Sequence, residues 1–279
     1  MTLQEAFAPV EDHRRGPAKR HDLQEMMVMA ICAVLCGADG WVDVADWCAG
    51  EEGWLKTFLV LKNGTPSHDT FGEIFRVLDA TVFERCFRQW VTRIVGVAEG
   101  VVAFDGKTVR GSKDGPNTAL HMVSAYATAL GVSLGQEGSA GKGNELTPIK
   151  ALLETLVLKG CIVTLDGLGC QTDVAEKIVA QGADYVLAVK DNQKNLSQAI
   201  VEFFDTAEAF AFRNIDVQTR TSVEKNHGRI ETRRVVLVPD VSWMDKPMRE
   251  DWKKLAGVGM IESELEIKGK VSVERRYFI

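Results

Sequence analysis

Two apolar segments of this chain end in the same dipeptide, Asp-Gly, and this pair constrains the fold more than any other feature. Residues 101–104 (VVAF) precede Asp105, and residues 161–165 (CIVTL) precede Asp166. A run that is apolar on both faces is typical of a strand buried within a sheet. Two such strands can lie side by side with their carboxylates at the sheet edge where ligands of α/β proteins collect. An ordinary Asp-Gly turn is the alternative interpretation.

The pattern around these segments predicts an α/β protein in three parts. The first part, over 1–96, is helical, with helices over 42–59 and 68–96 and helix-start signals at Asp22 and within 64–75. Strand and helix patterns then alternate over 97–208, including a helix over 144–160, which favours a partly parallel sheet. From 209 to 279 the pattern predicts a β-rich insertion that ends in a hairpin around KGK.

Composition limits the classes of function and the compartment. The net charge of −6 argues against binding nucleic acid over the whole surface. Two basic segments, 13–21 and 213–234, can still bind phosphates, although each is equally well a solvated loop or strand face. The apolar stretch from Met26 is too short to span a bilayer. Six cysteines without a CxxC motif predict reduced, buried thiols in a cytoplasmic protein, and the histidines lack metal-binding spacing.

Two carboxylates at one sheet edge repel each other unless a cation lies between them. Mg²⁺ prefers such oxygen ligands, commonly with waters and substrate phosphates completing the shell. The pair therefore indicates metal-assisted phosphoryl transfer. Two other interpretations are weakened by the residues. A P-loop needs glycine where Val101 stands, and a phosphatase with an aspartate nucleophile usually has a second aspartate where Lys107 stands.

Several long motifs, in order along nearly the whole chain, resemble one family. They are PSHDTFGEIFRVLD, AFDGKTVRGS, ALHMVSAYA, KGNELTPIKALLETL, KGCIVTLDGLGCQ, DYVLAVKDNQKNL, HGRIETRR and ERRYFI. The chain resembles the H-repeat-associated insertion-sequence transposases, which are DDE transposases with an RNase H-like catalytic fold. The resemblance implies Mg²⁺- or Mn²⁺-dependent cleavage and transfer of DNA strands. It also implies transposon ends and target DNA as partners, a homo-oligomer, and a place at the bacterial nucleoid.

By this resemblance, Asp105 and Asp166 match the first two metal-binding carboxylates of the DDE triad. The third, a glutamate in a segment like HW-x-IEN-x-LHW, has no counterpart before the sequence ends at RYFI. We therefore expect a C-terminally truncated chain. The first interpretation is a DDE transposase; the alternatives are an inactive remnant that at most binds DNA or self-associates, and an RNase H-like hydrolase completed by another acid. Glu145, which opens a helix, and Glu231 are the candidates; first-turn and strand structural roles are their alternatives.

Further polar residues are expected to contact DNA. Lys107 and Arg110 follow the first aspartate and face the same cleft, unless they are simply exposed turn charges. Three residues after the third strand of the core could contact the DNA backbone, and two belong to the HGRIETRR motif. These five are Lys190, Asn192, Gln193, His227 and Arg229.

Overall fold

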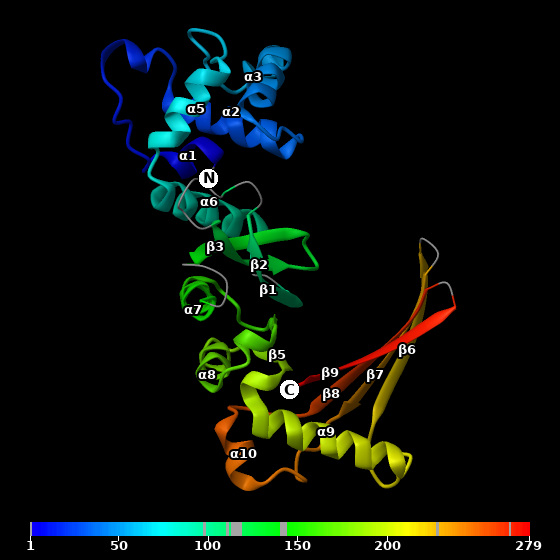
Figure 1. Cartoon of the computed structure of the whole chain (residues 1–279). Coiled ribbons are helices and arrows are strands. Elements are labelled where there is room, and N and C mark those ends of the chain that lie inside the picture. The colour runs from blue at the N-terminus through cyan, green and yellow to red at the C-terminus, as the bar shows by residue number, and fades with distance from the viewer. Residues whose placement is uncertain are drawn as a thin grey trace. The chain divides into compact units, whose positions relative to one another are not determined.

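The chain divides into two compact units, residues 1–96 and 97–279 (Figure 1). The computed structural model describes residues 2–96, 99–109, 112, 119–139, 144–226, 229–267 and 269–279. The first unit contains helices only. They are α1 (Leu3–Phe7), the 3-10 helix η1 (Gly16–Lys19), α2 (Leu23–Leu35), α3 (Trp41–Gly50), α4 (Glu52–Leu55), α5 (His68–Val77) and α6 (Ala80–Val95).

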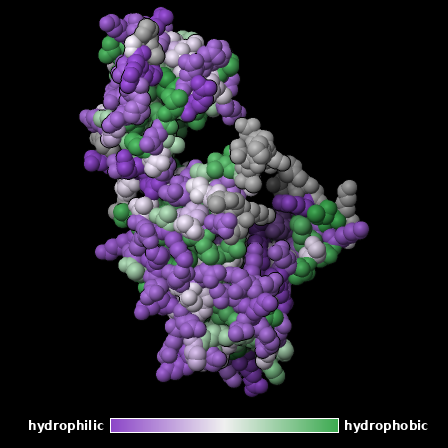
Figure 2. Space-filling model, turned by 60° about the vertical axis from the view of Figure 1, so that its left-hand side comes forward, coloured by the Kyte–Doolittle hydropathy of each residue, from purple (hydrophilic) through white to green (hydrophobic). Residues whose placement is uncertain are grey.

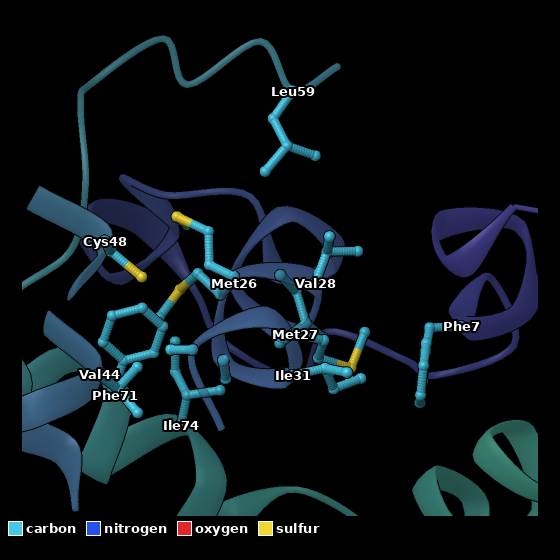
Figure 3. Packing of buried hydrophobic residues seen from close by; sticks show 14 of the residues in the cluster. Phe7, Met26, Met27, Val28, Ile31, Val44, Cys48, Leu59, Phe71 and Ile74 are labelled. Atoms are coloured by element: carbon cyan, nitrogen blue, oxygen red, sulfur yellow. The ribbon is translucent and has the colours of Figure 1, made fainter. Parts of the chain in front are cut away.

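Helix α2 is the centre of the first unit. Its N-cap is Asp22, whose carboxylate accepts a hydrogen bond from the backbone N–H of Glu25 at 3.0 Å. Figure 3 shows α2 side chains such as Met26 between Phe71 of α5 and Phe7 of α1. Because α2 is apolar on nearly all sides, it is buried as the core of this unit. None of the described helices is both long and apolar enough to cross a membrane.

Two of the helices expected from the sequence are broken in the structure. The pattern over 68–96 forms α5 and α6, because Leu78 is extended and Asp79 starts a new helix. The Asp79 carboxylate accepts hydrogen bonds from the backbone N–H groups of Thr81 and Val82. A short acidic side chain competes with helix continuation in this way. The pattern over 42–59 likewise splits into α3 and α4 at Glu51.

The second unit is a mixed α/β structure built on a nine-stranded sheet in the order β3-β2-β1-β4-β5-β9-β8-β7-β6. The pairs β1–β4 and β4–β5 are parallel and the other neighbours are antiparallel. The strands are β1 (Val101–Thr108), β2 (His121–Ala127), β3 (Val132–Ser139), β4 (Ile162–Leu165), β5 (Asp184–Val189), β6 (Gln218–Asn226), β7 (Arg229–Val238), β8 (Val258–Ile267) and β9 (Lys270–Phe278).

Helices cover one face of the core strands. They are α7 (Leu146–Thr155), which packs on β2 and β3, α8 (Thr172–Ala180), which packs on β5, and α9 (Lys194–Ala209), which packs on β9. The helix expected over 144–160 ends at Thr155, since Leu156 is extended and Gly160 has a positive φ of 80°. A short helix that the sequence did not indicate, α10 (Lys246–Asp251), begins at the carboxylate cap of Asp245.

The strands of the expected β-rich insertion join the core sheet directly. Strand β9 pairs with β5 through Ala188–Phe278 and Val189–Tyr277, and β8, β7 and β6 follow it outward (Figure 1). The strand ends of β1 and β4 therefore lie within one continuous sheet, which fixes the positions of the residues that follow them.

Hydrophilic side chains cover most of the face drawn in Figure 2, with hydrophobic ones in small groups.

Candidate functional site

The two aspartates follow the ends of parallel neighbouring strands. Strands β1 and β4 are parallel neighbours, paired from Val101–Ile162 to Ala103–Thr164. Continued for two more residues along both strands, this register would put Asp105 opposite Asp166. Level residues of adjacent strands lie about 4.8 Å apart and point to the same face. That the two carboxylates meet at one sheet edge stays a prediction, which the parallel register supports.

Strand alternation defines the face that the carboxylates occupy. Val102 and Phe104 of β1 are buried on the helix-covered face, so Asp105 points to the opposite face. In β4, Val163 and Leu165 are buried in the same way, which puts Asp166 on the face of Asp105. Both aspartates are exposed to solvent.

Each carboxylate has one local partner. Lys107 lies two residues beyond Asp105 on the same face, and its Nζ is 3.1 Å from Asp105 Oδ2. With side chains 81% and 58% exposed, this ion pair is screened and exchangeable. Asp166 caps the 3-10 helix η2 (Gly167–Gly169), because its Oδ1 accepts a hydrogen bond from the Leu168 N–H at 3.1 Å. Neither contact closes the carboxylate to a cation.

The donor set suits one hard divalent cation. Mg²⁺ is commonly held by one or two carboxylates, with waters and substrate phosphates as its other ligands. Within the residues that the structure describes, no group of three or more His, Cys, Asp or Glu side chains is placed to hold a metal. Asp105 and Asp166 are therefore two candidate protein ligands for such a cation.

Glu145, expected as a possible third acid, has another environment. It is the N-cap residue of α7 and is buried, and its Oε1 is 2.6 Å from His121 Nε2. A Cβ placed on Gly106 would come within 2.7 Å of the Glu145 carboxyl carbon, so Glu145 lies on the Gly106 side of β1. Asp105 points to the other side, so the structure does not bring Glu145 to the aspartate pair. Nothing in the local sequence indicates which side of the sheet this acid takes.

The other candidate acid, Glu231, lies in β7. Its Oε1 accepts a hydrogen bond from Arg233 Nε at 2.8 Å, and it is paired across the strands with Glu224 and Leu265. These contacts agree with the alternative interpretation, in which Glu231 has a structural role in a strand. Strand β7 is separated from β4 by β5, β9 and β8 in the sheet. Glu231 is therefore not part of the aspartate site.

The turn after β5 lies beside the Asp166 turn. The side chains of Asn192 and Gln193 donate hydrogen bonds to the backbone oxygen of Cys170, at 3.2 and 3.0 Å. The Lys190 side chain lies against Gly167. The structure thus brings Lys190 to the strand edge of the aspartates, while the two amides serve to hold the neighbouring loop.

The remaining expected DNA contacts divide in two groups. Arg110 and His227 lie outside the described residues. Arg229 is the first residue of β7. The opposite end of β7, at Leu237, is the end that lies nearest to β5 in the sheet, and it is eight residues away from Arg229. At about 3.4 Å per residue, this is roughly 27 Å along the strand. Arg229 is therefore far along the strand from the edge where Lys107 and Lys190 lie.

The cysteines are all free, but they are not all buried as the sequence suggested. Cys36, just after α2, is exposed, and Cys32 is half-buried. Burial raises the pKa of Cys48 and of Cys170 to about 12. A thiol with so high a pKa is almost entirely protonated at neutral pH and is therefore a poor nucleophile.

One buried polar group near the site was missed by the sequence analysis. His121 begins β2 and is 3% exposed, although the alternating pattern of ALHMVSAYA suggested only an ordinary strand. The signal that could have indicated it is its position. A histidine at an inward place of an otherwise apolar alternation must find a buried polar partner.

Comparison with known proteins defines the class to which this fold and site belong. Residues 70–257 match the family described as Transposase DDE domain, and residues 4–91 match the family described as DDE_Tnp_1-associated. The chain therefore belongs to the insertion-sequence transposases that carry a DDE domain.

Particular relatives agree with this assignment. The chain is 41% identical over 277 residues to an uncharacterized protein in the dhlA 3′ region of Xanthobacter autotrophicus, covering 98% of this chain and 92% of that protein. It is 35% identical to the putative transposase YncI of Escherichia coli O157:H7, covering 100% of this chain and 72% of the relative. It is 37% identical to the H repeat-associated putative transposase YhhI of Escherichia coli K12, covering 85% and 64%.

Among solved structures, the piggyBac transposase synaptic complex with hairpin DNA overlaps 83% of this chain and 53% of that one, with a TM-score of 0.35 and 11% identity. This TM-score is too low to assign a shared fold. Family membership thus rests on sequence. The chain spans 72% and 64% of the lengths of the two relatives named as putative transposases.

Proposed function

We propose that this chain binds Mg²⁺ or Mn²⁺ through Asp105 and Asp166 and cleaves and transfers DNA strands during transposition, on an RNase H-like core. The observation that supports the proposal is the parallel register of β1 and β4, which, if continued to the two aspartates, would set their carboxylates level on one face. Carboxylates so placed repel each other, and this repulsion is relieved when a cation binds. Family membership supplies DNA as the substrate.

A divalent cation at such a site polarises the scissile phosphate and stabilises charge that develops on the attacking and leaving oxygens. The chain's own residues hold and surround that position. Lys107 and Lys190 put positive charge beside Asp105 and Asp166, respectively. When a phosphate group arrives, Lys107 can exchange its exposed carboxylate partner for a phosphate oxygen, because the ion pair is mostly open to water.

DNA binding by this chain should weaken as salt rises, because lysine and arginine side chains of its local basic segments release counterions from the phosphates that they neutralise. We propose that Lys107 and Lys190 contact the backbone near the reacting phosphate. Arg229, at the far end of β7, would contact DNA elsewhere along its length. A DNA-bound protein of this kind belongs in the bacterial cytoplasm at the nucleoid, as a homo-oligomer on the transposon ends.

The test compares Mn²⁺ binding by calorimetry with Mn²⁺-dependent nicking of labelled DNA. Asp105→Asn and Asp166→Asn should each lose both. Asp184→Asn is the matched control, because Asp184 is an exposed aspartate at the opposite end of β5, paired with Lys254. It should keep both properties.

Two results would contradict the proposal in different ways. Parent-like Mn²⁺ affinity in both aspartate variants would remove the metal site. Metal binding that depends on both aspartates, without nicking by the parent chain, would contradict the proposed cleavage activity. The second result would indicate a non-catalytic protein that binds DNA or associates with other copies of itself.

A further inference from the structure

We infer that His121 and Glu145 form a buried brace that positions the Asp105 end of β1 for metal binding. This inference rests on the proposed function, because it concerns how the first metal ligand is held. Both residues are positioning residues, since they act through the strand and do not reach the face of the two aspartates.

The brace joins three elements at one point. The His121 side chain, from the first residue of β2, is 4% exposed, and the Glu145 side chain, from the N-cap of α7, is 9% exposed. Glu145 Oε1 lies 2.6 Å from His121 Nε2. On the other side of the ring, Nδ1 lies 3.0 Å from the hydroxyl oxygen of Thr108, in β1. Both ring nitrogens are thus occupied, which fixes the orientation of the imidazole.

The His121–Glu145 pair lies close to Gly106, the residue that follows Asp105. A Cβ atom on Gly106 would lie 2.7 Å from both Cδ and Oε1 of Glu145, and 2.9 Å from His121 Nε2. Such separations are below van der Waals contact, so only glycine allows the histidine–glutamate pair to lie this close to the backbone. The position of the strand at Gly106 is therefore set by the pair.

This part of β1 needs support from outside the ladder. The last pair between β1 and β4 is Ala103–Thr164, whereas pairing with β2 continues to Thr108–His121. From Asp105 onward, β1 is hydrogen-bonded to a neighbouring strand on one side only. A strand segment paired on one side bends and frays more readily. Contact of Gly106 with the brace restrains that segment on the helix-covered face.

Burial makes the brace rigid. A carboxylate this far from water is stable only with a hydrogen-bonding partner, and a buried histidine likewise needs both ring nitrogens satisfied. Hydrogen-bonded partners behind a metal ligand set its position, and their loss commonly weakens metal affinity by about 10- to 100-fold. The brace is one residue removed from Asp105, where a shift of the backbone moves the carboxylate directly.

The test measures Mn²⁺ affinity by calorimetry on folded protein, with circular dichroism and thermal melting recorded in parallel. Glu145→Ala should weaken Mn²⁺ binding by about tenfold or more. Glu145→Gln keeps the acceptor oxygen and the shape of the side chain, so it should retain the parent affinity. Amide hydrogen exchange at 105–108 should accelerate in Glu145→Ala and not in Glu145→Gln.

Leu153→Ala is the matched control. Leu153 is also fully buried on α7, two turns further along the helix, so its truncation lowers the melting temperature without touching Gly106. It should leave Mn²⁺ affinity unchanged. Loss of affinity in Leu153→Ala equal to that in Glu145→Ala would show a general stability effect and overturn the inference.

Thr108→Val serves where Glu145→Ala fails to fold. It removes the hydroxyl that faces His121 Nδ1, is nearly isosteric, and leaves no buried charge unpaired. It should weaken Mn²⁺ binding in the same direction by a smaller factor. Parent-like affinity in folded Glu145→Ala, or in Thr108→Val where Glu145→Ala is unfolded, would overturn the brace. Parent-like affinity in Asp105→Asn and Asp166→Asn would instead remove the metal site itself.

Discussion

Lys190 lies across Gly167, the residue that follows Asp166. A Cβ atom at Gly167 would come within 2.6 Å of Lys190 Cδ and 3.0 Å of Lys190 Cβ, so the aliphatic stem rests on the backbone of the Asp166 turn. Lys190 is exposed, and lysine commonly keeps its ammonium in water while its stem covers other groups. The contact holds a positive charge at the strand edge of the two aspartates.

Lys190→Ala should weaken DNA binding by a similar factor on all sequences, because a phosphate contact carries no base information. The slope of log affinity against log salt should fall by about one. Fluorescence anisotropy at several salt concentrations measures both quantities. Lys159→Ala is the control, because the Lys159 stem lies against Gly182, before β5 rather than after it. An unchanged slope in Lys190→Ala would exclude a phosphate contact at this residue.

Mn²⁺ should raise the melting temperature of the parent chain. A ligand that binds only the folded state stabilises it by about 2.7 kcal/mol when its concentration is 100 times the dissociation constant. Without metal, Asp105→Asn and Asp166→Asn should be no less stable than the parent, because each relieves repulsion between the two carboxylates. Both should lose the metal-induced rise, as measured by melting with Mn²⁺ and with EDTA. A rise of parental size in either variant would contradict a shared site.

Gly106→Ala should destabilise the second unit, because the new methyl group overlaps Glu145 and His121. Overpacking of this kind typically costs 1–3 kcal/mol, or about 2 kcal/mol as a central value. Urea denaturation monitors the loss. Gly138→Ala, on β3 of the same sheet, is the control, since its Cβ would meet only Leu120 Cδ1 at 4.0 Å. Equal stability of the two variants would show that the brace yields without cost.

The cysteines should differ sharply in reactivity. At pH 8, Cys36 should react with a thiol reagent in the folded protein, because it is exposed. Cys48 and Cys170 should stay unmodified, since burial raises the pKa of each thiol to about 12 and the reactive thiolate is nearly absent four pH units below that value. Mass spectrometry after timed labelling locates the modified thiols, and urea should expose all of them. Early labelling of Cys170 would show that the loop after Asp166 opens.

Local signals were sufficient for part of this fold. Asp22 and Ser67 begin helices as expected, because a cap depends on hydrogen bonds within four residues. The same kind of signal was misjudged at Asp79, whose side chain starts a helix in the middle of a continuous apolar pattern. Caps compete with helix continuation by small energies, so the surrounding packing decides between the two.

The aspartate pair is a prediction from the sequence that has a simple physical reason. Strands apolar on both faces are buried, buried parallel strands lie side by side, and their carboxyl ends share one edge. Asp105 and Asp166 follow from these rules together with the period of two along a strand. The resemblance to a transposase family rests on the same residues and needs no structure.

Only the tertiary structure decided the position of Glu145. Its distance from His121 is 24 residues along the chain, and the two meet because α7 packs on β2 and β3 from one side of the sheet. The sequence by itself determined which strands end in aspartate, since that depends on neighbouring residues. The side of the sheet on which a helix packs, and the pairing of β9 with β5, depend on contacts between distant segments, which no local pattern encodes.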